Sequence, residues 1–279
     1  PRRGPGQMWE RAAQRPKQMG GEVRLRTRAT TLHREGTRIT ALDLQDRDGN
    51  QTTVKPDHVL NSMPINELVR AMRPAAPDRV LEAADGLKYR DFLIVTLILD
   101  HADPFSDNWI YIHSPDVQVG RIQNFRAWSP AMLPDQRTAS IGMEYFCHKG
   151  DGLWNSPDEQ LLGLATRELE RLRLAPASSV IDGTVIRQPK AYPVYDADYK
   201  RHVDTIREWL LTFENLQSVG RNGMHRYNNQ DHSMLAAMLA ARNIMGADHD
   251  VWSVNVERSY HEDFVVDQRP SGAHASAGA

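Results

Sequence analysis

The stretch LQSVGRNGMHRYNNQDHSMLAAMLAARNIMG, residues 216–246, is the most informative part of this 279-residue chain. It begins like a short buried strand, continues as a polar loop and ends as an alanine-rich helix. A helix that begins soon after a strand presents unpaired N–H groups and the positive end of its dipole to a ligand. We therefore expect a ligand to lie at residues 228–234.

The composition is that of a soluble globular protein, with 40% hydrophobic and 25% charged residues. The net charge of −2 gives no general attraction to nucleic acid, although the first 38 residues are rich in arginine. The longest apolar run, Phe92–Leu99, is too short to cross a bilayer. We expect a small-molecule ligand, with no nucleic-acid partner and no membrane span.

The chain has one cysteine, Cys147, so it can form no internal disulfide and no thiolate zinc site. No signal peptide is visible, and together these features predict a cytoplasmic protein. The histidines are scattered without carboxylate neighbours at ligand spacing, so we expect no metal site.

Apolar periodicity and turn residues predict a mixed α/β (α+β) chain with more strands than helices. The first helix is expected at Met8–Met19, with Met8 and Trp9 in the core. Further helices are expected at 65–72, 78–84, 156–174 and 199–211. The expected strands are 22–26, 29–33, 38–44, 51–55, 58–62, 91–100, 109–113, 117–123, 139–146 and 180–187. The short strand that begins at Leu216 needs parallel partners, and the best candidates are Glu22–Arg26 and His58–Ser62.

Several catalytic motifs are absent from the sequence. There is no G-x-x-x-x-G-K-[ST] loop, no G-x-S-x-G elbow and no H-E-x-x-H pair. The dinucleotide fingerprint G-x-G-x-x-G is also missing, because Trp9 and Asn155 occupy the third glycine position of the two partial matches. No nucleotide triphosphatase, serine hydrolase or zinc protease is indicated.

Five blocks nevertheless occur in a characteristic order: GPGQMWERAAQ (4–14), GGEVRLRTRATTL (20–32), DHVLNSMPINELV (57–69), AYPVYDADY (191–199) and GRNGMHRYNNQDHSMLAAMLAARNI (220–244). This order resembles the FAD-dependent oxidoreductases of the amine oxidase and protoporphyrinogen oxidase superfamily, and within it UDP-galactopyranose mutase-like proteins. The resemblance implies FAD as cofactor. It also implies that the chain lacks an N-terminal FAD-binding segment with the glycine-rich turn.

The resemblance implies an incomplete FAD-binding Rossmann-like domain (1–87 and 213–264), a substrate-binding domain with a mostly antiparallel sheet and flanking helices (88–212), and a flexible tail (265–279). Three groups of residues are implied to bind the cofactor. Arg28, Ala29 and Thr30 would lie beside the adenine. Ser62, Met63 and Pro64 would lie near the flavin or the adenosine. Gly220 and Arg221 would approach the pyrophosphate, and the isoalloxazine would lie over Asn229, Gln230, Asp231, His232, Ser233 and Met234.

The candidate substrate residues are aromatic or basic side chains on predicted strands: Trp109, Tyr111, Arg121 and Tyr145. Tyr192, Tyr195 and Lys190 are the candidates for a catalytic role over the flavin. For the strand aromatics, an ordinary place in the core is the competing interpretation. For Asp231 the competing interpretation is a plain helix cap, and for Arg221 it is an ordinary position on the surface.

Three functions stay open at this level. The first is an FAD-dependent oxidoreductase whose flavin accepts a hydride from a small molecule. The second is a redox-neutral mutase that acts on an anionic nucleotide sugar. The third is a cofactor-free binding module or inactive fragment.

Overall fold

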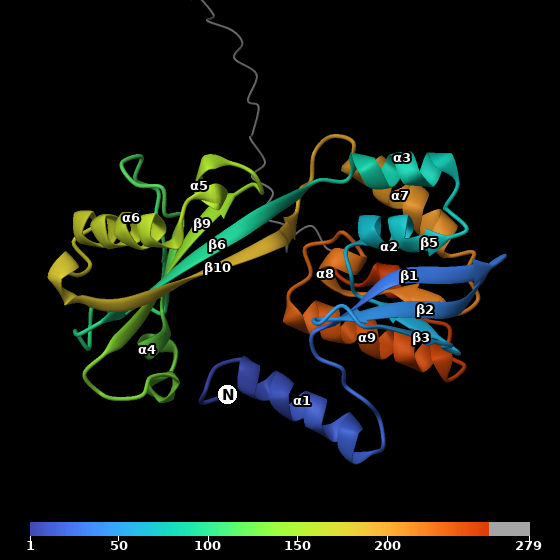
Figure 1. The fold of residues 1–279 in the computed structure, drawn as a ribbon, viewed down its shortest axis with the longest axis horizontal. Helices are drawn as coiled ribbons and strands as arrows, with labels where there is room; N and C mark the ends of the chain where they lie inside the picture. Colours follow the sequence, from blue (N-terminus) through green and yellow to red (C-terminus); the bar gives the residue numbers. More distant parts are fainter. Residues whose placement is uncertain (257–279) are drawn as a thin grey trace, which may run out of the picture.

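The computed structural model describes residues 1–256, and the tail expected at 265–279 lies outside them. The chain forms two lobes (Figure 1). It passes from one to the other at the start of a long strand, at residue 89, and returns at the end of a second long strand, at residue 193. We call the part built on residues 27–86 and 199–256 the first lobe, and the part built on residues 89–193 the sheet lobe.

The first lobe contains a four-stranded sheet of order β3-β2-β1-β5 and a separate two-stranded parallel sheet, β11-β4. Its strands are β1 (Thr27–Glu35), β2 (Arg38–Asp46), β3 (Gln51–Val54), β4 (Val59–Asn61), β5 (Met72–Arg73) and β11 (Leu216–Ser218). Its helices are α2 (Ile65–Ala71), α3 (Asp78–Gly86), α7 (Tyr199–Leu210), α8 (Gly220–Gly223) and α9 (Gln230–Ile244), with a short 3-10 turn at Val251–Ser253.

The sheet lobe is a five-stranded antiparallel sheet of order β10-β6-β9-β8-β7. Its strands are β6 (Tyr89–Leu99), β7 (Trp109–Tyr111), β8 (Arg121–Asn124), β9 (Ala139–Cys147) and β10 (Val180–Pro193). The helix α6 (Asp158–Arg171) packs on one face, and α4 (Phe125–Trp128) and α5 (Gly152–Asn155) are single turns. Short 3-10 turns occur at Pro130–Met132 and Ala177–Ser179.

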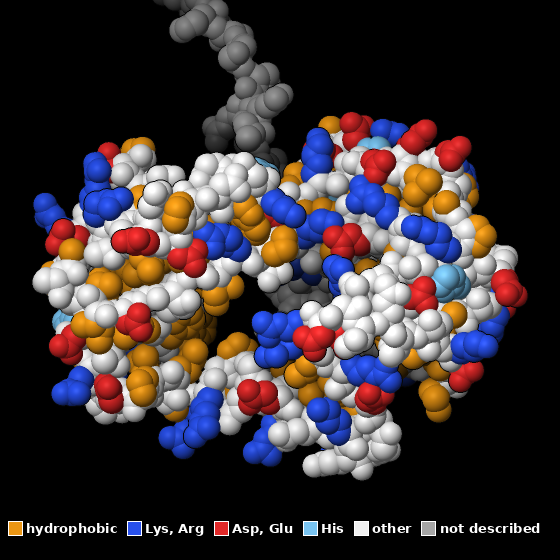
Figure 2. All heavy atoms as spheres, viewed as in Figure 1, with side chains coloured by type: hydrophobic (Ala, Val, Ile, Leu, Met, Phe, Trp, Pro, Cys, Tyr) orange, Lys and Arg blue, Asp and Glu red, His pale blue; other side chains and the backbone are white. Residues whose placement is uncertain are grey.

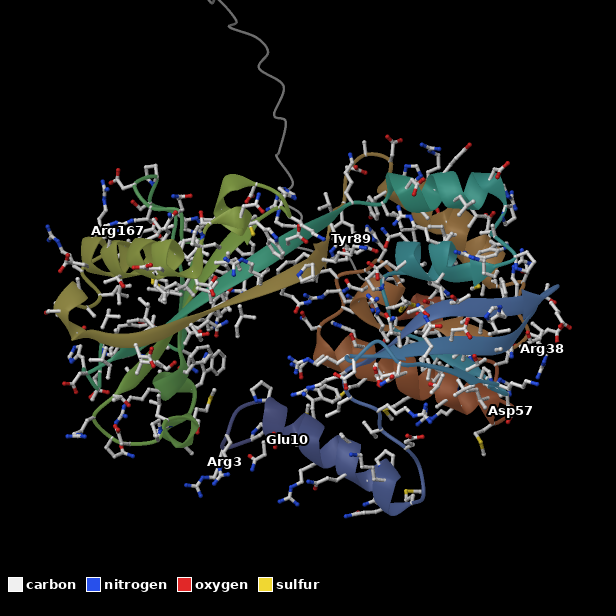
Figure 3. All side chains as sticks on the ribbon, in the orientation of Figure 1. Arg3, Glu10, Arg38, Asp57, Tyr89 and Arg167 are labelled. Atoms are coloured by element: carbon white, nitrogen blue, oxygen red, sulfur yellow. The ribbon has the colours of Figure 1, made fainter. Side chains whose placement is uncertain are left out.

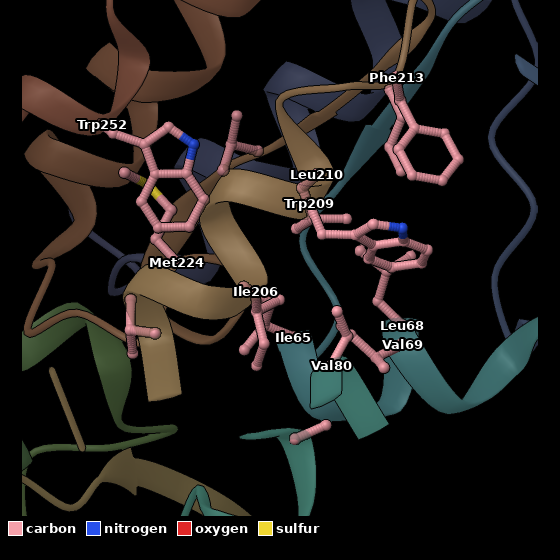
Figure 4. Packing of buried hydrophobic residues seen from close by; sticks show 14 of the residues in the cluster. Ile65, Leu68, Val69, Val80, Ile206, Trp209, Leu210, Phe213, Met224 and Trp252 are labelled. Atoms are coloured by element: carbon pink, nitrogen blue, oxygen red, sulfur yellow. The ribbon is translucent and has the colours of Figure 1, made fainter. Parts of the chain in front are cut away.

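Each lobe has its own hydrophobic core. In the first lobe, helices α2, α3 and α7 bury residues such as Leu68, Val80 and Ile206 (Figure 4). Trp209 and Phe213 close that core with an edge-to-face contact of 5.0 Å between ring centroids. Helix α7 packs in this core, whereas the prediction placed residues 88–212 in the substrate-binding domain. The predicted domain boundary at residue 212 therefore does not follow the packing.

Helix α1 (Gly6–Gln18) buries none of its residues, so the expectation that Met8 and Trp9 are core residues is wrong. It lies beneath the opening between the lobes, and Arg3 lies in the segment just before it (Figure 3). The apolar residues of α1 recur with helical spacing, and this pattern explains why the helix could be predicted from the sequence. That spacing alone does not say what covers the apolar face.

The strand pairings correct one prediction and confirm another. β11 pairs in parallel with β4, as expected for His58–Ser62. The expected strand at Glu22–Arg26 is wrong, because Arg26 has φ of 56° and the Glu22 carboxylate accepts a local hydrogen bond from Arg24. β8 begins only at Arg121, and β10 extends through Pro193 rather than ending at Arg187.

Within residues 1–256, no helix combines the length and apolar character needed to cross a membrane. The same residues contain no group of three or more His, Cys, Asp or Glu side chains arranged to bind a metal ion.

Candidate functional site

The N-terminus of α9 begins at Asn229, which is its cap residue. The backbone N–H of Asn229 donates to Nδ1 of His232 at 3.3 Å, and the Asp231 carboxylate lies 3.4 Å from the same nitrogen. Asp231 is therefore a residue of the first turn, and not the cap that its sequence position suggested. The Asn229 side chain accepts from the backbone N–H of His232, and the N–H groups of Gln230 and Asp231 have no partner within the helix, so this end favours a carbonyl oxygen or an anion.

Arg221 connects α8 to the sheet lobe. Its Nε donates to the carbonyl oxygen of Asn228 at 2.9 Å, and its guanidinium carbon lies 5.1 Å and 5.0 Å from the ring centroids of Tyr192 and Tyr227. Two aromatic faces stabilise a guanidinium by cation–π attraction and fix its plane. The cation is thus held at the junction of the lobes.

A cavity of about 700 Å³ lies beside this arginine. Its lining comes from both lobes: Trp109, Arg121, Gln123, Trp128, Arg221, Asn229, Gln230 and Asp231. Figure 2 shows the opening between the lobes, with hydrophobic side chains on its sheet-lobe wall. The structure therefore brings Asn229, Gln230 and Asp231, Arg221 and two of the predicted substrate residues to one place, whereas His232, Ser233 and Met234 do not line the cavity.

Glycine positions hold α8 against β4 and the start of α9. Gly220 has φ of +79°, and a Cβ there would approach only Ser233, at 3.9 Å. A Cβ at Gly223 would lie 2.9 Å from the carbonyl oxygen of Asn61 and 3.3 Å from Cα of Ser62. Of the predicted residues 62–64, Ser62 therefore adjoins α8.

Arg28, Ala29 and Thr30 lie in β1 and line no part of that cavity. Arg28 donates to Oε1 of Gln45 at 2.7 Å and borders a separate open hollow of about 490 Å³ with Arg26 and Arg47. The structure thus leaves this predicted group apart from the α9 residues.

The sheet-lobe wall of the cavity carries Arg121, whose positive charge is compensated by an ion pair with Glu144. The Arg121 guanidinium lies 5.8 Å and 5.9 Å from the ring centroids of Trp109 and Tyr111 and forms a short ion pair with Glu144. Burial opposes the charge of Arg121, but the hydrogen bond and the charge of Glu144 outweigh it and raise the pKa of Arg121. Gln123 donates to the other Glu144 oxygen at 2.7 Å. This wall therefore offers aromatic rings and a charge-compensated pair.

The three catalytic candidates occupy different surroundings. The Tyr192 hydroxyl lies 3.4 Å from Arg121 Nη2, close to the cavity. Tyr195 packs against Tyr199 and His225, and burial raises the pKa of its hydroxyl. The Lys190 ammonium forms a short ion pair with Glu67 of α2. Of the three, only Tyr192 contacts residues that line the cavity, Arg121 and Arg221, although it does not line the cavity itself.

Tyr145 is fully buried, and its hydroxyl donates to Glu168 of α6 at 3.0 Å. The expectation that it contacts substrate is therefore corrected: it lies on the α6 face of the sheet. Successive strand residues point to opposite faces, and Arg121 pairs in register with Glu144. That alternation assigns Glu144, and not Tyr145, to the cavity face, and it is the signal that the sequence interpretation missed.

Tyr145→Phe is expected to lower the free energy of unfolding by about 1 kcal/mol, because one buried hydrogen bond is lost. KM for any substrate of the assembled enzyme should not change, since the ring lies on the far face of the sheet. Chemical denaturation and steady-state kinetics measure the two effects. A raised KM at unchanged stability would contradict the placement.

His225 packs against Tyr89, which begins β6 at the junction of the lobes (Figure 3). It is 2% exposed, and Nδ1 has no hydrogen-bond partner within residues 1–256. Its ring centroid lies 4.9 Å from that of Tyr89 and 6.1 Å from that of Tyr195. Burial lowers the pKa of His225 from 6.5 to about 4. The neutral ring thus fills the junction between the lobes.

The unfolded chain binds a proton at His225 below pH 6.5, whereas the folded chain does so only near pH 4. The free energy of unfolding should therefore fall by about 3 kcal/mol as the pH drops through this window. Denaturation at several pH values measures the slope. In His225→Gln this contribution to the slope should vanish, whatever the stability of the variant. An unchanged slope would contradict a buried neutral ring.

Comparisons with known proteins identify the family of the chain and similar folds. Residues 1–196 match the family model described as flavin containing amine oxidoreductase. A crystal structure of reduced UDP-galactopyranose mutase is similar, with 16% identity and a TM-score of 0.70 over 86% of this chain and 51% of that one. A putative protoporphyrinogen oxidase from Exiguobacterium sp. 255-15 shows 17% identity and a TM-score of 0.58 over 85% of this chain and 51% of that one.

No curated protein matches the chain. The chain spans about half the length of these two solved structures. Their low sequence identity shows a shared fold, whereas the family model covers more than two thirds of the present sequence. The chain belongs to the flavin containing amine oxidoreductase family.

Proposed function

We propose that this chain is the part of an FAD-dependent oxidoreductase that carries the substrate wall and the helix end beneath the flavin. The observation that carries the proposal is the shared cavity, in which Arg221 and the start of α9 face Trp109 and Arg121. When bound, the flavin supplies the acceptor for a hydride. The side chains of this chain bind and orient the cofactor and the substrate.

The donors at the cavity fit a flavin dinucleotide. The N–H groups that open α9 suit the carbonyl edge of the ring, where negative charge gathers on reduction. The Arg221 guanidinium suits a pyrophosphate, and no carboxylate of residues 1–256 lies within ion-pair distance of it. Gly220 leaves the space before Ser233 open to a close approach. We assign Ser62–Pro64 to the same side, and Arg28–Thr30 to the adenine end.

The substrate would lie against Trp109, Tyr111 and Tyr192. Since Glu144 already compensates the charge of Arg121, the wall favours a substrate without a diphosphate. An amine or another small molecule with an oxidisable C–H bond fits this wall better than a nucleotide sugar does. A redox-neutral mutase is therefore the second candidate, supported by the shared fold with the reduced mutase structure.

The test is anaerobic reduction of the flavin-loaded protein by a panel of primary and secondary amines. Bleaching of the flavin absorbance by an amine, with recovery in air, would support the oxidoreductase. Conversion of UDP-galactopyranose to its furanose form by the dithionite-reduced protein, without net electron flow, would support the mutase. Protein that stays colourless with excess FAD would leave only a cofactor-free module.

A further inference from the structure

Strand β10 is interrupted where it approaches the first lobe. Gln188 and Tyr192 are four positions apart in β10, yet their partners in β6 are only two positions apart. Residues 189–191 therefore lie opposite one residue of β6, Asp91, and we call them the β10 bulge. Because the bulge lies outside the regular ladder between these strands, other groups must hold it in place.

The backbone of the β10 bulge is in an unfavourable conformation. Lys190 has φ of 52°, in the left-handed region where a Cβ atom is crowded. Pro189 precedes it and has no N–H group to donate. A residue other than glycine keeps such a conformation only when the surrounding structure holds it there. The contacts of the bulge therefore decide where its carbonyl groups point.

The Asp91 carboxylate supplies the contact from the sheet lobe. Its Oδ1 accepts a hydrogen bond from the backbone N–H of Lys190 at 2.7 Å, and its Oδ2 accepts a short one from the N–H of Lys149. Asp91 is 7% exposed, and hydrogen bonds from backbone N–H groups to a carboxylate are among the stronger ones. This carboxylate thus ties the β10 bulge to the turn that follows β9.

Helix α8 contacts the same bulge from the first lobe. Nδ2 of Asn222 donates to the carbonyl oxygen of Lys190 at 3.1 Å, and Nη1 of Arg221 donates to that of Ala191 at 3.5 Å. Tyr192 is the first paired residue beyond the bulge, and its ring centroid lies 5.1 Å from the guanidinium carbon of Arg221. The conformation of the bulge therefore sets a carbonyl group and a ring that both contact Arg221.

We propose that Asp91 is a positioning residue for Arg221, whose guanidinium it orients through the β10 bulge. Asp91 does not line the cavity shared by the lobes, so it acts through the residues that it holds. The inference rests on the proposed function, in which Arg221 contacts the cofactor. It extends the cofactor site to a buried carboxylate of the sheet lobe.

The first readout needs no cofactor. Nitrogen-15 NMR detects the Nε–H group of an arginine, and its exchange with solvent reports how firmly the group is held. Nε of Arg221 donates to the carbonyl oxygen of Asn228, so its exchange should be slow. Arg221→Ala assigns the signal by removing it. In Asp91→Ala both backbone donors lose their acceptor, and we expect this exchange to be at least about fivefold faster.

Asp151→Ala is the matched control. The Asp151 carboxylate also accepts from two backbone N–H groups, those of His148 and Trp154, at 2.8 and 2.7 Å. The variant therefore loosens the turn that contains Lys149 without touching the β10 bulge. It should leave the exchange of Arg221 Nε–H unchanged. Equal acceleration in both variants would show that the turn, and not the bulge, carries the effect, and would overturn the proposal.

Asn222→Ala keeps the proposal testable if Asp91→Ala does not fold. This variant retains the contacts of Asp91 and removes the hydrogen bond from α8 to the carbonyl oxygen of Lys190. It should also accelerate the exchange of Arg221 Nε–H. Unchanged exchange in either folded variant would overturn the proposal.

The second readout is the Kd for FAD in a double-variant cycle. Asp91→Ala should weaken FAD binding by about tenfold. Because Asp91 acts through Arg221, the double variant should bind no more weakly than Arg221→Ala alone, and additive losses would overturn the proposal. An unaltered Kd in Arg221→Ala would contradict the proposed function, whereas the exchange of Arg221 Nε–H would still test the positioning by Asp91.

Discussion

Arg221→Ala is expected to weaken FAD binding by roughly 30-fold, which corresponds to the loss of about 2 kcal/mol from a charge-assisted hydrogen bond. The guanidinium is held by Tyr192, Tyr227 and the carbonyl oxygen of Asn228, so it is already oriented before a ligand arrives. Preorganised donors lose little entropy on binding. Fluorescence titration of the apoprotein with FAD measures the effect.

Two controls distinguish a direct contact from a general loss of structure. Arg221→Lys keeps the charge but loses the planar stacking on both rings, so it should recover only part of the affinity. Arg201→Ala removes an arginine of α7 whose side chain is 71% exposed, and it should leave the Kd unchanged. An unaltered Kd for Arg221→Ala would contradict the assignment of this residue to the cofactor.

Glu168→Gln is expected to lower the free energy of unfolding by about 2–4 kcal/mol. The Glu168 carboxylate accepts hydrogen bonds from the backbone N–H groups of Gln118 and Val119 and from the Tyr145 hydroxyl, at 2.7, 3.1 and 3.0 Å. A glutamine has one acceptor oxygen and one donor nitrogen, so at least one buried N–H group would face another donor. Chemical denaturation monitored by circular dichroism measures the loss.

Glu159→Gln, on the exposed side of the same helix α6, serves as the matched control and should change the stability by less than about 0.5 kcal/mol. Because the loop at Gln118 and Val119 leads into β8, the Glu168 variant should also loosen Arg121. An equal, small effect in both variants would show that α6 does not anchor the sheet through this carboxylate.

Most elements with a clear hydrophobic period were predictable from the sequence. The apolar, β-branched strand at Asp91–Asp100 and the pairing of the two short parallel strands agree with β6 and the β11-β4 sheet, and the helix expected at 156–174 corresponds to α6, which begins two residues later, at Asp158. In each case, the local pattern and the burial in the fold agree. The Glu22–Arg26 strand failed because its alternating charges satisfy each other locally.

The site was predictable where one segment carries it. The residues that open α9 follow one another in sequence, so a single block indicated them. Glu144, Gln123 and Trp128 come from separate strands and a turn, and only the register of β8 with β9 brings them to one wall. Tyr145 was selected for its aromatic ring, but it lies one residue away from the exposed face. A strand residue cannot be assigned to a face until its register is known.

The most direct measurement of the central claim is the crystal structure of the protein loaded with FAD. The account predicts the three-ring system of the flavin between the first turn of α9 and the wall formed by Trp109 and Arg121, with Arg221 at the pyrophosphate. Electron density for the flavin elsewhere, with the side chains of residues 229–234 filling this cavity, would contradict it.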